Sequence, residues 1–435
     1  MTNTEPGTVV IVGGGAGGLE LAARLGGKPG SRRVVLVDRA AYHIWKPSLH
    51  EVAAGTLDIH REGLSYFMLA KDRGFRFIRG EMDGLDREGK TVSLKPVFDE
   101  AHQEVLPRRK IAYDTLILAV GSRSNFFGTP GADKFAMAID STQQAETFRL
   151  KLLSALARAD SAKAGGGGST LRIAIVGAGA TGVELAAELT QSCADVAFYG
   201  LGHLDPATDV QITLLEGAPR ILSALPEKIS AAACRLLRDR GVAVETSVRI
   251  ASVQTDALYD DQGERYPADL CVWAAGIQAP EFLDTLGLST NRLHQIIVDG
   301  QLRSSDPHIL AFGDCAQAAW GPGGAFLPAR AQVAHQQSEF LYSLLTKGDA
   351  ARQAGRAFRY RDYGSLISIG HSRVVGSLMG VLTGKGLFVE GLFARLMYMS
   401  LHLMHHAVLL GVLRTGSLAL GRLLLKRGAP RVKLH

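Results

Sequence analysis

The chain has 435 residues, of which 46% are hydrophobic, and it carries 48 basic and 42 acidic side chains. This composition excludes a disordered or fibrous protein, and the length exceeds what one hydrophobic core usually spans, so we expect two or three domains. The polar start MTNTEPGT runs directly into VVIV without a charged region or an apolar leader, which favours a protein that is not exported.

Residues 9–25 predict a β-strand, a glycine loop and a helix in succession. The apolar run VVIV leads into Gly13, Gly15 and Gly18, which LELAARL follows. In a dinucleotide-binding loop such glycines allow a tight turn, a close approach of backbone N–H groups to a pyrophosphate, and contact between helix and strand. Asp38 ends the next apolar run, RRVVLVD, where a carboxylate accepts hydrogen bonds from a ribose.

Residues 171–190 repeat this pattern. Gly177, Gly179 and Gly182 lie between LRIAIV and VELAAELT, and Glu216 ends the run QITLLE. The separation of Gly177 and Glu216 is longer than usual for such a unit, and we attribute it to an insertion within CADVAFYGLGHLDPATD. The two loops indicate either two nucleotide ligands or a duplication with one inactive copy, and glycine turns without any ligand are the remaining alternative.

Later apolar runs have the composition of buried strands that end at a glycine. YDTLILAVG ends at Gly121, DLCVWAAG ends at Gly276, and ILAFGDCAQ reaches Gly313 and Asp314. Together with the two loops, these runs closely resemble the flavoprotein family that has two dinucleotide-binding domains. The resemblance implies FAD on the first unit, NAD(P)H on the second, and Asp314 as the residue that holds the ribityl chain.

The second acidic residue bears on which nicotinamide nucleotide is used. Glu216 favours NADH, because a carboxylate at the ribose repels a 2′-phosphate. Arg220 follows four residues later and leaves NADPH open, because its guanidinium is able to accept such a phosphate.

Cysteine usage separates the members of this superfamily. Residues 39–60 contain no cysteine, which excludes the disulfide reductases. Sulfide:quinone oxidoreductases need paired cysteines near the flavin, and only Cys193 and Cys315 are loose candidates; ferredoxin reductases also stay open. The cysteines show no metal-ligand spacing, so no metal is expected.

The closest resemblance is to bacterial type II NADH:quinone oxidoreductases. It rests on WKPSLHEVAAG, EGAPRILSALP, VWAAGIQAP, PARAQVAHQ and the C-terminal VKLH. It implies tightly bound FAD, NADH as substrate and a membrane quinone as electron acceptor, without proton pumping. In that family the motif that begins at Ala331 borders the quinone pocket, which assigns Gln332 and Gln336 to quinone. Glu184 then lies near the nicotinamide, and Lys46 near the flavin edge.

Local arguments support part of this assignment. A helix that begins after Pro328 puts Gln332 and Gln336 on one face, although an ordinary amphipathic helix has the same spacing. Glu184 has a strong alternative as a packing residue, because Glu20 takes the same position in the first unit. His335 is read as structural in preference to a proton relay.

The C-terminal region has a distinct charge pattern. From Gly391 onward it has no acidic residue and seven basic ones, namely Arg395, Arg414, Arg422, Lys426, Arg427, Arg431 and Lys433. Residues 396–413 are uncharged, and His402, His405 and His406 form a polar stripe with Arg395 and Tyr398 along a predicted helix. We expect basic amphipathic helices that lie on anionic lipid at the cytoplasmic face of the cell membrane. A dimer or packing face and a spanning helix are the alternatives.

The sequence therefore predicts an α/β protein with two Rossmann-like domains, as in glutathione reductase, and a C-terminal helical anchor. The FAD domain comprises 1–145 and 286–345, the NADH domain 146–285, and the C-terminal strands and helices 346–435. The expected activity is oxidation of NADH by a membrane quinone through FAD, with no nucleic-acid partner. A flavin redox sensor that docks a partner is the alternative of another class.

Overall fold

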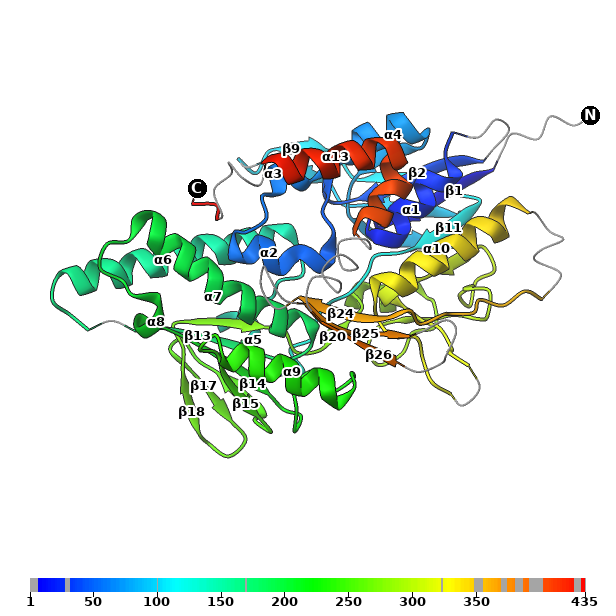
Figure 1. Ribbon diagram of the computed structural model, residues 1–435. Helices are drawn as coiled ribbons and strands as arrows, with labels where there is room; N and C mark the ends of the chain where they lie inside the picture. The colour runs from blue at the N-terminus through cyan, green and yellow to red at the C-terminus, as the bar shows by residue number, and fades with distance from the viewer. Residues whose placement is uncertain are drawn as a thin grey trace, which may run out of the picture.

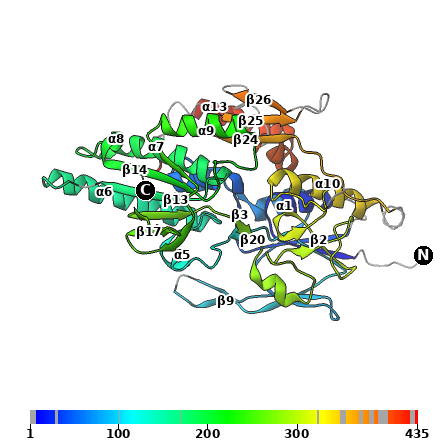
Figure 2. The same cartoon turned by 90° about the horizontal axis from the view of Figure 1, so that it is seen from below.

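The computed structural model describes residues 7–27, 32–99, 101–168, 170–321, 324–347, 355–368, 374–379, 386–390, 402–425 and 432–434. The described chain is built around two parallel sheets, each at the centre of one unit. In Figure 2 the second sheet and α6 lie in the left half of the molecule, and the first sheet and α10 lie in the right half. The two-unit α/β fold predicted from the sequence is confirmed.

The first unit is a five-stranded parallel sheet in the order β22-β11-β1-β2-β5. Its strands are β1 (Thr8–Val12), β2 (Arg33–Asp38), β5 (Arg76–Arg79), β11 (Thr115–Leu118) and β22 (Ile309–Ala311). Alternate residues of β1 belong to separate hydrophobic cores on the two faces of the sheet. Val9 and Ile11 pack against three helices, α1 (Ala16–Leu25), α4 (Tyr66–Arg73) and α10 (Ala331–Thr346). Val10 and Val12 pack on the opposite face. Burial on both faces explains the continuous apolar runs.

The opposite face of this sheet is covered by small elements. These are β6 (Met82–Asp86), β7 (Thr91–Leu94), β10 (Arg109–Ala112), η2 (Glu281–Leu286), β21 (Ile296–Ile297) and β23 (Ala316–Gln317). The hairpin of β8 (Val97–Phe98) and β9 (Glu104–Leu106) follows β7.

The second unit is a four-stranded parallel sheet in the order β15-β14-β13-β19. Its strands are β13 (Leu171–Val176), β14 (Val210–Glu216), β15 (Ala243–Thr246) and β19 (Leu270–Trp273). Helices α6 (Thr142–Ala164), α7 (Ala180–Gly200), α8 (Pro206–Asp209) and α9 (Glu227–Arg238) complete it. The extra residues before Glu216 lengthen α7 and form α8, which accounts for the unusual spacing.

A small antiparallel sheet and a short helix complete the second unit. The sheet contains β16 (Ile250–Val253), β17 (Ala257–Asp260) and β18 (Arg265–Pro267), and α5 (Ala132–Phe135) packs beside it. The predicted domain limits stay predictions; α6 runs through the limit at residue 145, and η2 through that at 285.

One short stretch of the first unit packs on the second. It comprises β3 (Tyr42–His43), η1 (Lys46–Ser48), α2 (Leu49–Ala54), α3 (Ile59–Glu62) and β4 (Leu64–Ser65). Leu49 and Val52 of α2 are buried in the same core as α6 and α7 (Figure 1). A second link is the antiparallel pair of β12 (Arg123–Ser124) with β20 (Ile277–Gln278).

The C-terminal part has a three-stranded antiparallel sheet and two helical stretches. The sheet is formed by β24 (Gly364–Ser368), β25 (Val374–Met379) and β26 (Gly386–Glu390). Residues 402–410 are helical, and α13 (Val412–Leu425) follows after Gly411, whose φ of +84° is unfavourable for other residues. The uncharged run at 396–413 is thus not one continuous helix. No helix among the described residues is long and apolar enough to cross a membrane.

The end of the described chain corrects one prediction for the basic tail. Lys433 does not face outward: its Nζ lies 3.4 Å from Asp58 and 3.6 Å from Glu146, and its backbone N–H donates to the carbonyl of Gly55. Val432 beside it is 2% exposed. Lys433 therefore neutralises carboxylates of this chain and is not available to a lipid surface.

Candidate functional site

The first glycine loop has the backbone geometry of a phosphate site. A Cβ on Gly18 would lie 2.0 Å from the carbonyl oxygen of Gly13, so only glycine permits this contact of helix and loop. Gly15 is the N-cap of α1 and provides no side-chain cap, which leaves the first N–H groups of the helix for an anion. Asp38 accepts a hydrogen bond of 2.6 Å from the N–H of Gly14, which fixes the loop from the neighbouring strand.

The second loop repeats this construction at equivalent positions. A Cβ on Gly182 would lie 1.9 Å from the carbonyl oxygen of Gly177. Gly179 begins α7, again without a side-chain cap on the first N–H groups. Glu216 accepts a bond of 2.6 Å from the N–H of Ala178, as Asp38 does from Gly14 in the first loop. The second copy therefore keeps the construction of the first.

Arg220 lies close to Glu216 in sequence but is bound within its own loop. Its guanidinium donates to the carbonyl oxygens of Ser223 at 2.6 Å and Leu225 at 2.8 Å. A 2′-phosphate would have to compete with these bonds, which weakens the argument for NADPH that its position in the sequence allowed.

Three loops that are far apart in the sequence meet between the two units. Lys46 Nζ donates to the carbonyl oxygen of Ser122 at 2.7 Å, and Ser122 Oγ donates to Asp314 Oδ2 at 2.7 Å. Gly121 directly precedes Ser122 at the end of β11, and Gly276 is adjacent because its carbonyl accepts from Asn125 beside β12. The structure thus brings together Lys46, Gly121, Gly276 and Asp314 as parts of one region.

The sequence reasoning missed Gln337. This side chain is 1% exposed, and its Oε1 accepts a bond of 2.8 Å from the N–H of Gly313. It fixes the turn that presents Asp314 and connects that turn to α10. The only signal in the sequence was a second glutamine directly after Gln336.

The helix predicted after Pro328 is confirmed as α10, and its two glutamines have different partners. Gln336 donates to the carbonyl oxygen of Arg361 at 2.8 Å and accepts from its N–H at 3.0 Å, so its amide is already paired. Among the described residues, Gln332 bonds through its oxygen, which accepts from the hydroxyl of Tyr360. In this conformation Gln332, on the same helix face as Gln336, is the better donor to an added ligand. Ala331 is the first residue of the helix.

Glu184 is buried where α2 packs on α7. Its Oε1 accepts a 3.0 Å bond from the N–H of Ser368, and its Oε2 lies 3.6 Å from Nδ1 of His50. Burial, reinforced by the carboxylates of Glu51 and Glu188, raises the pKa of Glu184 to about 8 in spite of the Ser368 bond. Burial also lowers the pKa of His50, so the imidazole beside it is neutral. Glu184 therefore holds a proton at neutral pH.

A single segment connects the two groups of predicted catalytic residues. Tyr360 and Arg361 contact Gln332 and Gln336, and Ser368 of β24, a few residues later, contacts Glu184. These contacts were not predictable, because the sequence FRYRDYGSLISIG indicates only strand material, and the strand itself is limited to β24.

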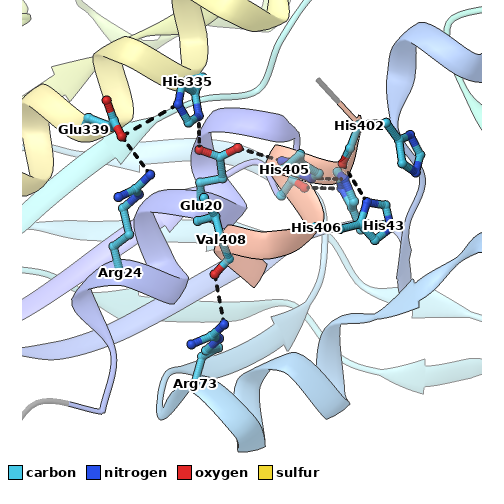
Figure 3. A network of polar contacts seen from close by, with 11 residues as sticks. Glu20, Arg24, His43, Arg73, His335, Glu339, His402, His405, His406 and Val408 are labelled. Atoms are coloured by element: carbon cyan, nitrogen blue, oxygen red, sulfur yellow. Dashed lines mark hydrogen bonds and ion pairs between the residues drawn. The ribbon is translucent and has the colours of Figure 1, made fainter. Parts of the chain in front are cut away.

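The C-terminal histidines face the protein. His405 and His406 are 2% and 4% exposed, and His405 contacts Glu20 of α1 and His43 of β3 (Figure 3). Arg395 and Tyr398, the other members of the predicted stripe, lie outside the described residues. His402 and His406 line a small cavity together with Ile44, Trp45, Leu57 and Leu64. Among the described residues no cluster of side chains is suited to hold a metal ion.

The cysteines give no support to thiol chemistry. Burial raises the pKa of the Cys193 and Cys271 thiols to about 12 and that of Cys315 to about 11. Cys193 and Cys315 also belong to different hydrophobic cores. A redox pair beside the dinucleotide loops is therefore not formed by these residues.

This fold and these two loops define an oxidoreductase with paired dinucleotide-binding units. Residues 7–338 match the family model described as pyridine nucleotide-disulphide oxidoreductase. The type II NADH:quinone oxidoreductase of Haemophilus influenzae is 38% identical, over 98% of this chain and 99% of that protein. The Staphylococcus haemolyticus enzyme of the same name is 27% identical, over 87% and 91%.

A solved structure agrees with this result at the level of the fold. NDH2 from Plasmodium falciparum in complex with NADH has a TM-score of 0.77 and 19% identity, and covers 94% of this chain and 98% of its own. The chain belongs to the pyridine nucleotide-disulphide oxidoreductases and, within them, to the type II NADH:quinone oxidoreductases. It is an enzyme that oxidises NADH and reduces a quinone.

Proposed function

We propose that this enzyme holds FAD on the first unit, NADH on the second, and a membrane quinone at the start of α10, and that it does not pump protons. The observation that carries the proposal is the pair of intact glycine loops, in each of which a carboxylate accepts a hydrogen bond from a loop N–H group. Hydrogen bonds also connect Lys46 to Ser122 and Ser122 to Asp314. Bound FAD would accept a hydride from NADH and return the electrons to quinone.

The first unit offers donors and acceptors that match the parts of FAD. The uncapped N–H groups at the start of α1 suit its pyrophosphate, and Asp38 suits the hydroxyls of its adenosine ribose. Asp314 suits the ribityl hydroxyls, and Ser122 holds one of its oxygens in place. The ammonium of Lys46 adds a positive charge in the same region.

The second unit suits NADH. The start of α7 has the same uncapped N–H groups, and Glu216 presents a carboxylate where a 2′-phosphate would be repelled. Glu184 follows in the same helix, and its proton makes it a hydrogen-bond donor near the nicotinamide without adding a negative charge.

The quinone side is assigned to α10. A quinone carbonyl needs a hydrogen-bond donor, and the amide of Gln332 provides one without a charge. The small cavity under residues 402–410 is lined by Ile44, Leu57 and Leu64 together with polar residues such as Ser48 and Glu62, and in this conformation it is too small for a quinone ring. The overall reaction, NADH + H⁺ + quinone → NAD⁺ + quinol, takes up one proton from solvent, and without pumping this proton comes from the same side of the membrane as NADH.

The membrane surface is assigned to the C-terminal helices. Val412 and Leu413 are 78% and 89% exposed, and Phe67 and Met68 of α4 are more than half exposed. Helix α4 adjoins α13 through the ion pair of Asp72 with Arg414 (Figure 1). Exposed apolar residues beside basic ones favour attachment to anionic lipid at the cytoplasmic face. The alternative is that this exposed surface contacts a second copy of the chain in a homodimer.

Absorption spectroscopy of the purified protein tests the central claim. The spectrum should show an oxidised flavin that bleaches on addition of NADH and recovers on addition of a water-soluble quinone, and the released cofactor should be identified as FAD by mass. A protein that binds no flavin, or a flavin that NADH does not bleach, contradicts the proposal. Proteoliposomes that acidify during turnover would contradict the absence of pumping.

A further inference from the structure

A buried polar chain joins the C-terminal helix at residues 402–410 to the first glycine loop. Figure 3 shows its members Glu20, His335, His405 and His43. Glu20 of α1 is 1% exposed, and its two oxygens lie 2.6 Å from Nδ1 of His335 and 2.6 Å from Nδ1 of His405. His405 Nε2 lies 2.9 Å from Nε2 of His43, and His43 Nδ1 lies 3.1 Å from the carbonyl oxygen of Gly14.

The partners in this chain determine where the protons lie. A carbonyl oxygen only accepts, so Nδ1 of His43 carries a hydrogen and donates to Gly14. Burial, followed by the charge of His405, keeps the pKa of His43 well below its usual range, so this ring is neutral and its Nε2 accepts. His405 must then donate from Nε2 to His43, and its bond to Glu20 requires one further proton between Nδ1 and the carboxylate.

That further proton lies between Nδ1 of His405 and the carboxyl of Glu20. Burial, the largest influence, opposes a charge on Glu20, but the hydrogen bonds from His335 and His405 outweigh it and lower the pKa of the carboxyl. Each carboxyl oxygen of Glu20 has one histidine nitrogen as a close partner, so this buried group is hydrogen-bonded on both sides.

The other charged and titratable groups near the pair lie at its edges. On α10, His335 separates Glu20 from Glu339, which is half exposed and also pairs with Arg24 of α1. His402 and His406 lie one helical turn apart on the helix of His405, and their rings stack with centroids 4.3 Å apart. Tyr66 and Asp38 bind the Gly14 peptide at the far end of the chain.

The chain ends on a peptide that the cofactor loop uses. The Gly14 carbonyl accepts from His43 and, at 2.7 Å, from the hydroxyl of Tyr66, and the Gly14 N–H donates to Asp38. At the other end of the helix, Arg73 of α4 donates to the carbonyl oxygens of Val408 and Leu409. The helix is therefore held at two places, one of which passes through two hydrogen bonds to the glycine loop.

We propose that the buried hydrogen-bonded pair of Glu20 with His405 is a latch that seats the helix at 402–410 on the first glycine loop, so that seating of the helix and retention of the bound dinucleotide are coupled. Glu20 and His405 are then positioning residues. The coupling rests on the proposed FAD site. Because coupling between two equilibria is reciprocal, bound FAD protects the helix, and a displaced helix loosens FAD.

The test compares Glu20→Gln, His405→Gln and the double variant with the unmutated holoenzyme. Glu339→Gln is the matched control, because it makes the same chemical change at the exposed edge of the chain. Amide hydrogen exchange of residues 402–410 should accelerate roughly tenfold or more in each single variant, the loss expected for a buried charged hydrogen bond. Flavin release, followed by its fluorescence, should accelerate with it, and the control should change neither.

The double variant shows whether the two residues act as a unit. Its exchange and flavin release should match the larger single effect, because one removed partner already breaks the pair. If the effects of the two single substitutions on exchange and flavin release added up in the double variant, the latch would be contradicted. It would also be contradicted if amide exchange in β13 and β14 accelerated as much as in residues 402–410. Unchanged exchange in Glu20→Gln overturns the latch, and faster exchange with unchanged flavin release overturns the coupling. An unmutated protein without flavin refutes the FAD proposal, while its exchange pattern still tests the latch.

Discussion

The proton on Glu184 gives the stability of the fold a specific pH dependence. The side chain is 7% exposed, and its pKa rises from an ordinary value of 4.5 to about 8. The folded protein therefore binds a proton that the unfolded chain releases at neutral pH. Stability from this group is complete below the unfolded pKa and is lost as the pH rises toward the folded pKa. Glu184→Gln replaces the protonated carboxyl with a neutral group of the same shape and removes this penalty.

The magnitude follows from the two pKa values. Keeping the proton on Glu184 costs about 1 kcal/mol at pH 5 and about 3 kcal/mol at pH 7, so the relative advantage of the glutamine variant grows by roughly 2 kcal/mol between them. The measurement is urea unfolding of both proteins at each pH, followed by circular dichroism. Subtracting the unfolding free energies of the two proteins at each pH cancels the contributions of groups that titrate in both. A difference that does not vary with pH would refute the buried, protonated carboxyl.

Three further predictions concern the two substrates and the membrane. Gln332→Ala should slow flavin reoxidation by quinone roughly 2- to 13-fold, the worth of one hydrogen bond, with reduction by NADH unchanged in stopped-flow traces; the reverse pattern would place this glutamine at the nicotinamide. Glu216→Ala should raise the KM for NADH and narrow the NADH/NADPH ratio while FAD is retained, and equal use of both nucleotides by the unmutated enzyme would contradict the assignment. Leu413→Ser should weaken binding to anionic vesicles, measured by flotation, roughly tenfold. The substitution removes most of the apolar surface that this exposed leucine would bury in the lipid. Phe198→Ser, at the exposed end of α7, is its control, and an equal loss in both would show nonspecific adhesion.

The two dinucleotide units were predictable because their rules are local. A strand, a glycine turn, a helix and the acidic end of the next strand occur within one stretch of chain, so the spacing of Gly13, Gly18 and Asp38 was sufficient. The same held for the second unit once α7 was allowed to be long.

Contacts between distant segments were not predictable in the same way. Nothing near Ser122 or Gln337 in the sequence indicates that both would bind the turn at Gly313 and Asp314, because that depends on how β11, β22 and α10 pack. The histidines at 402–406 illustrate the same limit. Helical spacing placed them on one face, but only the position of Glu20 shows that this face is turned inward.

The C-terminal region departed most from expectation because its pattern was read without its partners. Amphipathic spacing continues through Gly411, yet a glycine with positive φ separates two helical stretches there. The positive charge of Lys433 suggested a lipid partner, whereas Asp58 and Glu146, far away in sequence, are the groups that pair with it.

The docked end of the chain bears on how the helices proposed for membrane attachment are held. The segment that contains residues 402–425 starts after β26 and returns to the protein at Val432 and Lys433, where the backbone binds Gly55 and Arg149. The helices at 402–425 are thus followed along the chain by a second contact with the body of the protein. In the proposed attachment through α13, these contacts at Val432 and Lys433 restrict how far the body of the enzyme can turn relative to the bilayer.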